Sequence, residues 1–279
     1  MTFRFQHSEI AAQAVRCAAL LVSLSSCTSV ALRQGTSLGS YDGMVASGGL
    51  LTKAKLRVDS AAVVSAQTVR IAPTTVDAVR GSFDAKDLAL LTNAVDRALC
   101  TGLSDRFKVV AANQPADLIV HATVTDIVAT NQAIAATSTV ATLGASVALV
   151  PIPRIPIGLG GLSVEAEAVR PDGSQSAAMI WSRGANVLTT KARISKVGDA
   201  YSLASAFGAD FSRMLVKGQY PFKGTPVMPS MQKLKASLGG DPKYEACKAF
   251  GSAPGIKGAV AGQLGLPPGW SDKGAAASQ

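Results

Sequence analysis

The stretch that most constrains the fold is a β-hairpin that the sequence spells out between residues 162 and 186. Apolar and polar residues alternate over 162–170, the turn sequence Pro171-Asp172-Gly173 follows, and the alternation resumes over 177–186. A period of two indicates strands with one buried face, and Asp-Gly between two such strands favours a tight turn. The sequence therefore predicts a pair of antiparallel strands here.

Two amphipathic helices are predicted from apolar residues that recur at steps of three and four. The first begins after Ser82 or Asp84 as N-cap, and the second begins at Asp199 as N-cap. Each helix has one apolar stripe that would face a core. The stripes are Leu88, Leu91, Val95 and Leu99 in the first helix and Leu203, Phe207, Phe211 and Met214 in the second.

Further strands are predicted around Val69 and Ile71, where Pro73 ends the pattern, and over 107–111 and 118–128. Strands outnumber helices and are mostly joined by hairpins. The predicted fold class is therefore α+β, with a single mostly antiparallel sheet and two main helices packed on one face. One domain suffices for 279 residues.

The segment 132–162 is unusual because its only charged residue is Arg154. Its larger apolar residues keep helical spacing up to Pro151, and smaller residues form a second stripe. We interpret this apolar insertion as an internal helix packed on the domain's own sheet. An oligomer interface or a membrane contact is the alternative, because small residues let another backbone approach closely. The larger stripe comprises Val140, Leu143, Val147 and Val150.

Glu165 and Glu167 share one face of the predicted hairpin. A carboxylate pair at this spacing could serve acid-base chemistry. On the solvent face of a strand, with basic residues such as Arg183 nearby, we interpret it as a solvated pair.

Enzymatic chemistry finds little support in the sequence. The two histidines are His7, which would be lost with a signal peptide, and His121, which falls in a predicted strand. No nucleophile elbow, phosphate loop or set of metal-ligand spacings occurs. We therefore expect no enzyme activity, no metal and no cofactor, with an unrecognised Ser-Lys hydrolase as the rival hypothesis.

The N-terminus has the layout of a secretory signal, with Arg4 and Arg16 before an apolar block over 17–24. That block is shorter than the about 20 residues that span a bilayer. It closes on Leu24-Ser25-Ser26-Cys27, which resembles the bacterial lipobox. The resemblance implies that residues 1–26 are a signal peptide and that the Cys27 thiol carries a diacylglyceryl group, with palmitate among its fatty acids. Ordinary cleavage after Ser26 or Ala31 is the alternative.

Cleavage before Cys27 would remove Cys17 and leave two free thiols, Cys100 and Cys247. An oxidising compartment favours their pairing as a disulfide that ties the middle of the chain to its C-terminal tail. Two independent buried thiols are the alternative. Thr28 stands where an aspartate would argue for inner-membrane retention in lipoproteins of this type, so we expect the outer membrane, facing the periplasm of a Gram-negative bacterium.

The chain is basic, with 27 Lys and Arg against 18 Asp and Glu. Near a membrane this favours anionic partners such as phospholipid head groups or acidic polymers, although a basic surface also serves solubility. The cations are scattered and aromatic residues make up only 5% of the chain, which argues against nucleic-acid binding.

Several short runs, together with the lipobox, resemble the bacterial lipoproteins grouped as domain-of-unknown-function family 3313. The resemblance extends over most of residues 27–250 and brings no known activity or catalytic residue. The order of elements also looks like that of envelope lipoproteins such as the curli-secretion pore and regulators of cell-wall synthases, in architecture only. The runs are Ser40-Tyr41-Asp42-Gly43-Met44, Thr68-Val69-Arg70-Ile71-Ala72-Pro73, Ala116-Asp117-Leu118 and Ala204-Ser205-Ala206-Phe207.

The predicted organisation is a signal peptide (1–26), a lipid anchor and flexible tether (27–54), an α+β periplasmic domain (55–217), and a Pro/Gly-rich tail (218–279). The tail should hold short helices around 231–238 and 244–250 and end in disorder over 273–279. The predicted function is a membrane-anchored lipoprotein with a non-catalytic binding or assembly role. The expected partners are other envelope proteins or further copies of this chain. The alternative function is that of a subunit in an oligomeric secretion or pore complex.

Overall fold

The computed structural model describes residues 30–77, 79, 81–146, 154–222, 230–272 and 274. Its centre is one eight-stranded sheet in the order β1-β2-β8-β7-β6-β3-β5, with β4 paired to β6. The strands are β1 Val45–Gly48, β2 Thr52–Val58, β3 Thr68–Ile71, β4 Thr75–Val76, β5 Lys108–Val109, β6 Leu118–Val128, β7 Gly161–Val169 and β8 Gln175–Gly184. The four long neighbouring pairs are antiparallel, whereas the short β3, β4 and β5 pair in parallel.

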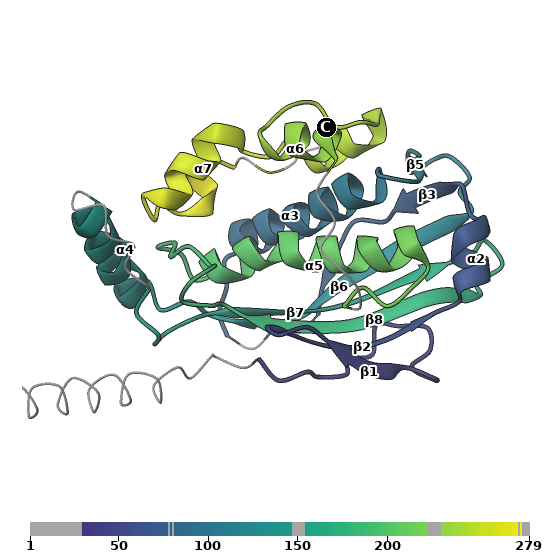
Figure 1. Ribbon diagram of the computed structural model, residues 1–279, viewed down its shortest axis with the longest axis horizontal. Helices are drawn as coiled ribbons and strands as arrows, with labels where there is room; N and C mark the ends of the chain where they lie inside the picture. The colour runs from purple at the N-terminus through teal and green to yellow at the C-terminus, as the bar shows by residue number, and fades with distance from the viewer. Residues whose placement is uncertain are drawn as a thin grey trace, which may run out of the picture.

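The two long helices α3 and α5 lie side by side on one face of this sheet, and the C-terminal helices lie over them (Figure 1). The α+β prediction, with two main helices on one face, is confirmed. The α-helices are α2 Ser60–Ser65, α3 Ala85–Leu103, α4 Gln132–Ser146, α5 Gly198–Lys217, α6 Met231–Ser237 and α7 Gly255–Gln263. Two 3-10 helices, η1 Glu245–Phe250 and η2 Pro268–Trp270, complete the described elements.

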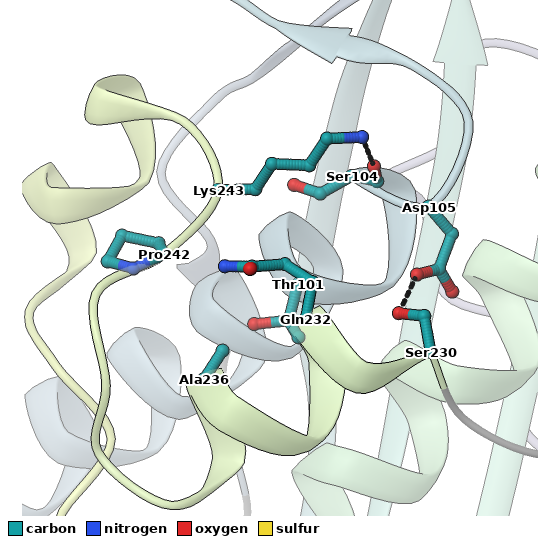
Figure 2. Close-up of a pocket in the computed structure, with 8 residues that line it drawn as sticks. All are labelled: Thr101, Ser104, Asp105, Ser230, Gln232, Ala236, Pro242 and Lys243. Carbon is teal, nitrogen blue, oxygen red and sulfur yellow. Dashed lines mark hydrogen bonds between the residues drawn. The ribbon is translucent and has the colours of Figure 1, made fainter.

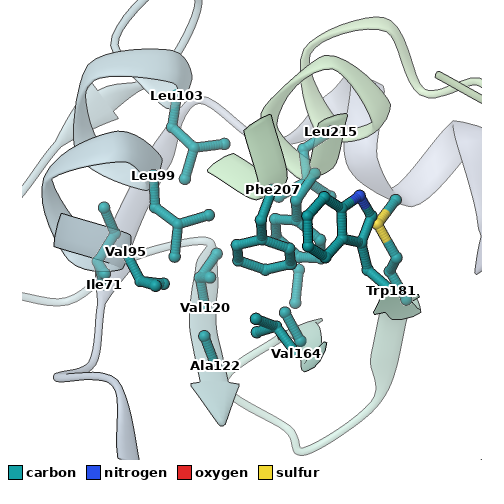
Figure 3. Close-up of a cluster of buried hydrophobic side chains, with 14 of the residues drawn as sticks. Ile71, Val95, Leu99, Leu103, Val120, Ala122, Val164, Trp181, Phe207 and Leu215 are labelled. Atoms are coloured by element: carbon teal, nitrogen blue, oxygen red, sulfur yellow. The ribbon is translucent and has the colours of Figure 1, made fainter. Parts of the chain in front are cut away.

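The hydrophobic core fills the space between the sheet and these two helices (Figure 3). Leu99 from α3 and Phe207 from α5 meet Val120 and Val164 from the central strands, all fully buried. The Trp181 ring packs edge to face on Phe207, with 5.6 Å between ring centroids. The apolar stripes read from the sequence thus form one core, as amphipathic elements require.

The predicted hairpin is β7 and β8, which pair in antiparallel register from Gly161 opposite Gly184 to Val169 opposite Gln175. Its turn includes Gly173 at a φ of 84°, a left-handed conformation that residues with a side chain rarely adopt. The turn chemistry of Asp172-Gly173 therefore fixes the register of β7 and β8, two strands at the centre of the sheet.

The expected flexible tether over 27–54 is wrong for its described part, residues 30–54. Residues 35–41 lie on the sheet face opposite the helices, and β1 and the start of β2 extend the sheet. Leu38 is buried there against Ala178 and Ile180 of β8. The segment is held because it covers apolar side chains and because buried carboxylates bind its backbone.

Glu165 and Glu167 are buried, so the interpretation of this carboxylate pair as solvated is wrong. Glu165 accepts hydrogen bonds from the backbone N–H of Gly35 and from the hydroxyls of Ser37 and Tyr41. Glu167 accepts one from the backbone N–H of Gly39. A buried carboxylate is tolerated only when its oxygens are hydrogen-bonded, and the glycine-rich segment supplies exposed N–H donors for this purpose.

The α4 helix of the apolar insertion does not pack on the sheet as we expected; it stands off the end of the sheet (Figure 1). Val140 of its predicted apolar stripe is exposed, and the buried positions are Ala135, Ser138 and Thr139. The stripe members Val147 and Val150 lie outside the described residues. No helix among the described residues is long and apolar enough to cross a bilayer.

Asp199 is not the N-cap of α5; Val197 holds that position, and Asp199 lies in the first turn. Its side chain turns away from the helix and forms a two-point ion pair with Arg154, with bonds of 2.5 and 3.0 Å. Both residues are buried. Asp199 thus pairs with Arg154, the single charged residue of the apolar insertion, and does not cap the helix. The pair is needed because an unpaired arginine could not be buried there.

The described part of the C-terminal tail contacts α3. Cys100 of α3 and Cys247 of η1 form a disulfide with a Cα–Cα distance of 5.8 Å, which is the pairing expected from the sequence. The short helices expected around 231–238 and 244–250 are α6 and η1, whereas α7 and η2 were not anticipated. The disorder predicted for 273–279 falls outside the described residues except at residue 274.

Candidate functional site

The largest cavity described here lies between the helix layer and the C-terminal tail and has a volume of about 560 Å³. Its walls come from α3, from α5, from the segment that follows β8, and from tail residues including Ala253 and Pro254. The polar members of the lining are Arg97, Thr101, Arg183, Thr189, Thr190, Lys191, Arg193, Tyr201, Ser202 and Ser205. The volume falls within the range typical of small-molecule sites.

The cavity is strongly basic. Four of its lining residues are cations, namely Arg97, Arg183, Lys191 and Arg193, and none of the described residues that line it is Asp or Glu. Three of these cations lie on the stretch that runs from the end of β8 to α5, and the fourth comes from α3. A concave surface with one sign of charge concentrates ligands of the opposite sign.

Asp272 partly compensates this charge from behind the lining. Its buried carboxylate pairs with the Arg97 guanidinium and accepts a hydrogen bond of 2.6 Å from the Tyr201 hydroxyl. Its negative charge also acts on Arg193. One carboxylate therefore faces two guanidinium groups, which leaves an excess of positive charge in the cavity.

Arg193 carries the most incomplete set of contacts. Its guanidinium lies over the Tyr201 ring, 5.4 Å from the centroid, and Nη2 donates a long hydrogen bond of 3.4 Å to the Gly258 carbonyl. Its Nε and Nη1 atoms are buried and have no hydrogen-bond partner among the described residues. Burial lowers the pKa of Arg193 despite the opposing influence of Tyr201 and Asp272. Each such unpaired buried donor costs about 1–3 kcal/mol.

The geometry suits a group with several acceptor oxygens, such as a phosphate or a carboxylate. Arginine presents its N–H donors in a planar arrangement that matches these anions, and Arg193 has one unpaired donor, Nε, on one side of its guanidinium and a second, Nη1, on the other. The Nε of Arg183 is likewise buried without a partner in the described part of the chain, although its charge also acts on Asp210.

A second cavity of about 210 Å³ lies where α6 and Lys243 meet the C-terminal end of α3 (Figure 2). It brings Ser104 and Lys243 together, the residue types that a Ser-Lys hydrolase needs. The Lys243 ammonium, however, donates to the Ser104 backbone carbonyl at 2.8 Å, and the Ser104 hydroxyl donates to the Cys100 carbonyl at 2.6 Å. Lys243 thus holds the tail on α3, the Ser104 hydroxyl bonds within α3, and the two side chains are not paired as nucleophile and base.

The other residues singled out from the sequence are placed as follows. Cys27 lies outside the described residues. His121 is exposed on β6, opposite Glu167 of β7, on the face away from the helices. Within the described part of the chain, no group of three or more His, Cys, Asp and Glu side chains could hold a metal ion.

The cations of the large cavity were not singled out from the sequence as a site. Arg97 lies 86 positions or more from the cluster at Arg183, Lys191 and Arg193, so no local spacing joins them. The one available signal was the basic stretch with Lys191 and Arg193 before α5, which the sequence analysis left without a role. Only the packing of α3 against α5 brings the two parts together.

Comparisons with solved structures find likenesses of low similarity. Two structures of PelC dodecamers from Paraburkholderia phytofirmans match with TM-scores of 0.37 and 0.35, each at 8% identity; they cover 61% and 60% of this chain and 99% and 98% of their own. A DUF4136 family protein from Bacteroides thetaiotaomicron matches with a TM-score of 0.31 at 8% identity, covering 60% of this chain and 97% of its own. At these scores the likenesses carry no argument about function.

The comparison with curated proteins found no significant match. The profile of the family described as "Protein of unknown function (DUF3313)" matches residues 33–211. This range begins in the segment bound by Glu165, contains all eight strands, and ends within α5. The chain belongs to the DUF3313 family.

Proposed function

We propose that this protein is an envelope lipoprotein whose folded domain binds an anionic group in the basic cavity and carries out no catalysis. The single observation that carries the proposal is the incompletely hydrogen-bonded guanidinium of Arg193, which lines the basic cavity and has two buried donors that lack a partner among the described residues. A phosphate or a carboxylate on the ligand would accept a hydrogen bond from one of these donors.

The membrane anchor in this proposal rests on the sequence. The apolar block over 17–24 and the run Leu24-Ser25-Ser26-Cys27 place a cysteine where a lipoprotein is acylated. Two or more acyl chains on Cys27 would hold the protein stably on a membrane. With Thr28 after the cysteine, we place it in the outer membrane, facing the periplasm.

The absence of catalysis is proposed from the roles that the polar side chains already have. In the smaller cavity, Ser104 and Lys243 both bond to backbone carbonyls. On the opposite face of the sheet, Glu165 and Glu167 accept hydrogen bonds from the N-terminal segment, and Glu167 accepts another from Gln175. Each of these candidates is already engaged in a structural hydrogen bond.

The binding proposal is tested by titrating the purified full-length protein, in detergent, with small anions followed by calorimetry and thermal unfolding. The probes are inorganic phosphate, glycerol phosphate and glucuronate, with uncharged glycerol and glucose as controls. We expect the anions to raise the unfolding temperature in a salt-sensitive manner and the uncharged compounds to leave it unchanged. Phosphate-bearing and carboxylate-bearing probes together show which chemistry the cavity prefers.

Arg193→Gln should weaken binding of the preferred anion by about tenfold or more, equivalent to about 1.4 kcal/mol. Lys108→Gln is the matched control, because it removes one positive charge from an exposed position on β5 outside the cavity. Equal binding by the two variants would show that the anion recognises overall charge and not the cavity. Separately, Cys27→Ala should release the protein from the membrane fraction and abolish labelling by palmitate.

A further inference from the structure

The first described residue, Val30, is fixed at one end of the sheet. Its side chain is buried, and its backbone carbonyl accepts a hydrogen bond of 3.4 Å from the Ser182 hydroxyl on β8. It occupies the space beside Gly161, where a Cβ atom would come within 2.1 Å of the valine methyl. The chain therefore enters the domain at a defined place, at the start of β7 and the end of β8.

Only residues 28 and 29 stand between Cys27 and Val30. Three residue steps span at most about 11 Å even when fully extended. If Cys27 carries acyl chains in a bilayer, this length is too short for the domain to stand off the membrane. The end of the sheet that holds Val30 must then lie at the bilayer surface.

That same end exposes large apolar side chains. Leu50, in the turn between β1 and β2, is 100% exposed, and Leu188, after β8, is 76% exposed. Ile157, shortly before β7, is 57% exposed. The strand register brings these three positions to one end, since Gly48 pairs with Lys53, Thr52 with Arg183, and Gly161 with Gly184. Leu50 and Val30 moreover line one cavity of about 310 Å³.

The charge at this end matches an anionic membrane. Lys53 lines the cavity that Val30 and Leu50 share, and none of the described residues in its lining is acidic. Each Lys or Arg close to an anionic surface contributes about 1 kcal/mol of attraction. Leucine side chains among basic residues are the composition of a surface that inserts shallowly at the headgroup boundary.

We infer that the end of the domain formed by Val30, Leu50, Ile157 and Leu188 is a bilayer-docking face. The face rests on the acylation of Cys27 proposed above. With this face on the membrane, α2 points toward the periplasm, because it lies at the opposite end of β2 and β8. The occupant is an anionic phospholipid surface, because the short distance to Cys27 brings lipid to this end whatever else the protein binds.

The test uses the full acylated protein with one introduced cysteine: Leu50→Cys, Leu188→Cys, or the control Val64→Cys. Val64 lies on α2 and is half exposed. Like Leu50 and Leu188 it is an accessible apolar residue, but it lies away from the proposed docking face. With Cys27 acylated and Cys100 bonded to Cys247, the introduced thiol is the one available for labelling in the mature protein. It is coupled to a nitrobenzoxadiazole fluorophore after reconstitution into vesicles of phosphatidylethanolamine and phosphatidylglycerol.

Nitroxide-labelled phospholipid should quench the fluorophore several-fold more at positions 50 and 188 than at position 64. Equal quenching at all three positions, in protein that floats with the vesicles, would overturn the docking face and leave the anchor standing. Shielding of positions 50 and 188 from iodide in water, with crosslinking between copies but no lipid quenching, would show a subunit interface instead. If mass spectrometry finds no acyl chains on Cys27, the anchor itself fails, and the docking face fails with it.

Discussion

The hydroxyl of Tyr41 donates a hydrogen bond of 2.7 Å to the carboxylate of Glu165, 124 residues further along the chain. Burial, together with the negative charge and hydrogen bond of Glu165, raises the pKa of Tyr41 to about 12. The phenol therefore remains a proton donor at any physiological pH. Through this bond the strand β7 holds the segment that leads to the proposed lipid anchor.

Removal of this hydroxyl should loosen the N-terminal segment without unfolding the domain. Hydrogen bonds to charged groups contribute about 1.5–3 kcal/mol, and Glu165 keeps its bonds to Gly35 and Ser37. Tyr41→Phe should therefore lower the free energy of unfolding by about 1–2 kcal/mol. Urea unfolding measures the loss, and trypsin cleavage after the exposed Arg33 reports on the segment itself. The control is Tyr244→Phe in the tail; if cleavage after Arg33 is equally fast in both variants, the Tyr41 bond does not hold the segment.

Glu165→Gln should be more damaging than Tyr41→Phe. The amide that replaces the carboxylate carries an NH₂ group, which would face N–H and O–H donors from residues 35–41. Leaving buried donors without acceptors costs about 1–3 kcal/mol for each group. A variant with unchanged stability and unchanged tryptic cleavage would contradict the role given to this carboxylate.

The sequence showed that Glu165 and Glu167 share a strand face, but it could not show what covers that face. The alternation over 162–170 requires only that one face be apolar. Coverage of the other depends on residues more than 120 positions earlier, in a Gly- and Ser-rich stretch with no period of its own. Such composition indicates a flexible tether, and only the tertiary hydrogen bonds to the two carboxylates override that tendency.

The buried pair of Arg154 and Asp199 should be essential to the end of the domain near α4. Asp199 also accepts a hydrogen bond of 2.7 Å from the backbone N–H of Gly160, so its loss would leave several donors unpaired. Removal of one partner of a buried ion pair costs about 3–5 kcal/mol, and we expect this loss for Asp199→Ala in chemical unfolding.

A double-mutant cycle separates the pair from its surroundings. Arg154→Met combined with Asp199→Leu should destabilise much less than the sum of the two single substitutions, because neither charge is then buried alone. Additive losses would show that the two residues act independently. The exposed pair of Lys248 and Glu245 is the control, and its cycle should give a coupling of no more than about 1 kcal/mol.

The disulfide should support the basic cavity as well as the fold. Cys247 holds the tail on α3, and the tail supplies Pro254 to the cavity wall and Asp272 to Arg97. Loss of a native disulfide costs about 2–5 kcal/mol. Cys100→Ser with Cys247→Ser should lower the free energy of unfolding by this amount and weaken anion binding. Wild-type protein treated with reductant should behave as the double variant does, and the double variant should not respond to reductant.

The disulfide could be predicted from the sequence, whereas the contacts of the basic cavity could not. The two cysteines could be paired by elimination once the signal peptide was recognised, because the compartment limits what thiols do. The positions of the two cysteines indicate that the tail crosses α3. They do not indicate that Asp272 pairs with Arg97 or that Arg193 has unpaired donors. Those contacts depend on how α7 and η2 fold back, and their residues have too little apolar periodicity to be assigned from sequence.

The stability of the fold should fall as pH rises through the titration of Asp96. This residue of α3 is buried and accepts a hydrogen bond of 3.0 Å from the backbone N–H of Thr74. Burial raises its pKa to about 6, against the opposing effects of the Thr74 hydrogen bonds and the Arg97 charge. Between about pH 4 and pH 6 the folded chain therefore holds a proton that the unfolded chain has lost, so unfolding becomes easier across this window.

The loss between pH 4 and pH 7 attributable to Asp96 is about 3 kcal/mol, at 1.36 kcal/mol for each unit of pKa difference. Asp96→Asn keeps a similar shape and an acceptor for Thr74 but cannot ionise. It should abolish this part of the pH dependence and be more stable than the wild type at pH 7, by an amount that shrinks as the pH approaches 4. Urea unfolding at several pH values measures both curves. Asp42→Asn, at an exposed position, should leave the wild-type curve unchanged, and an Asp96→Asn curve parallel to the wild type would show that another group titrates.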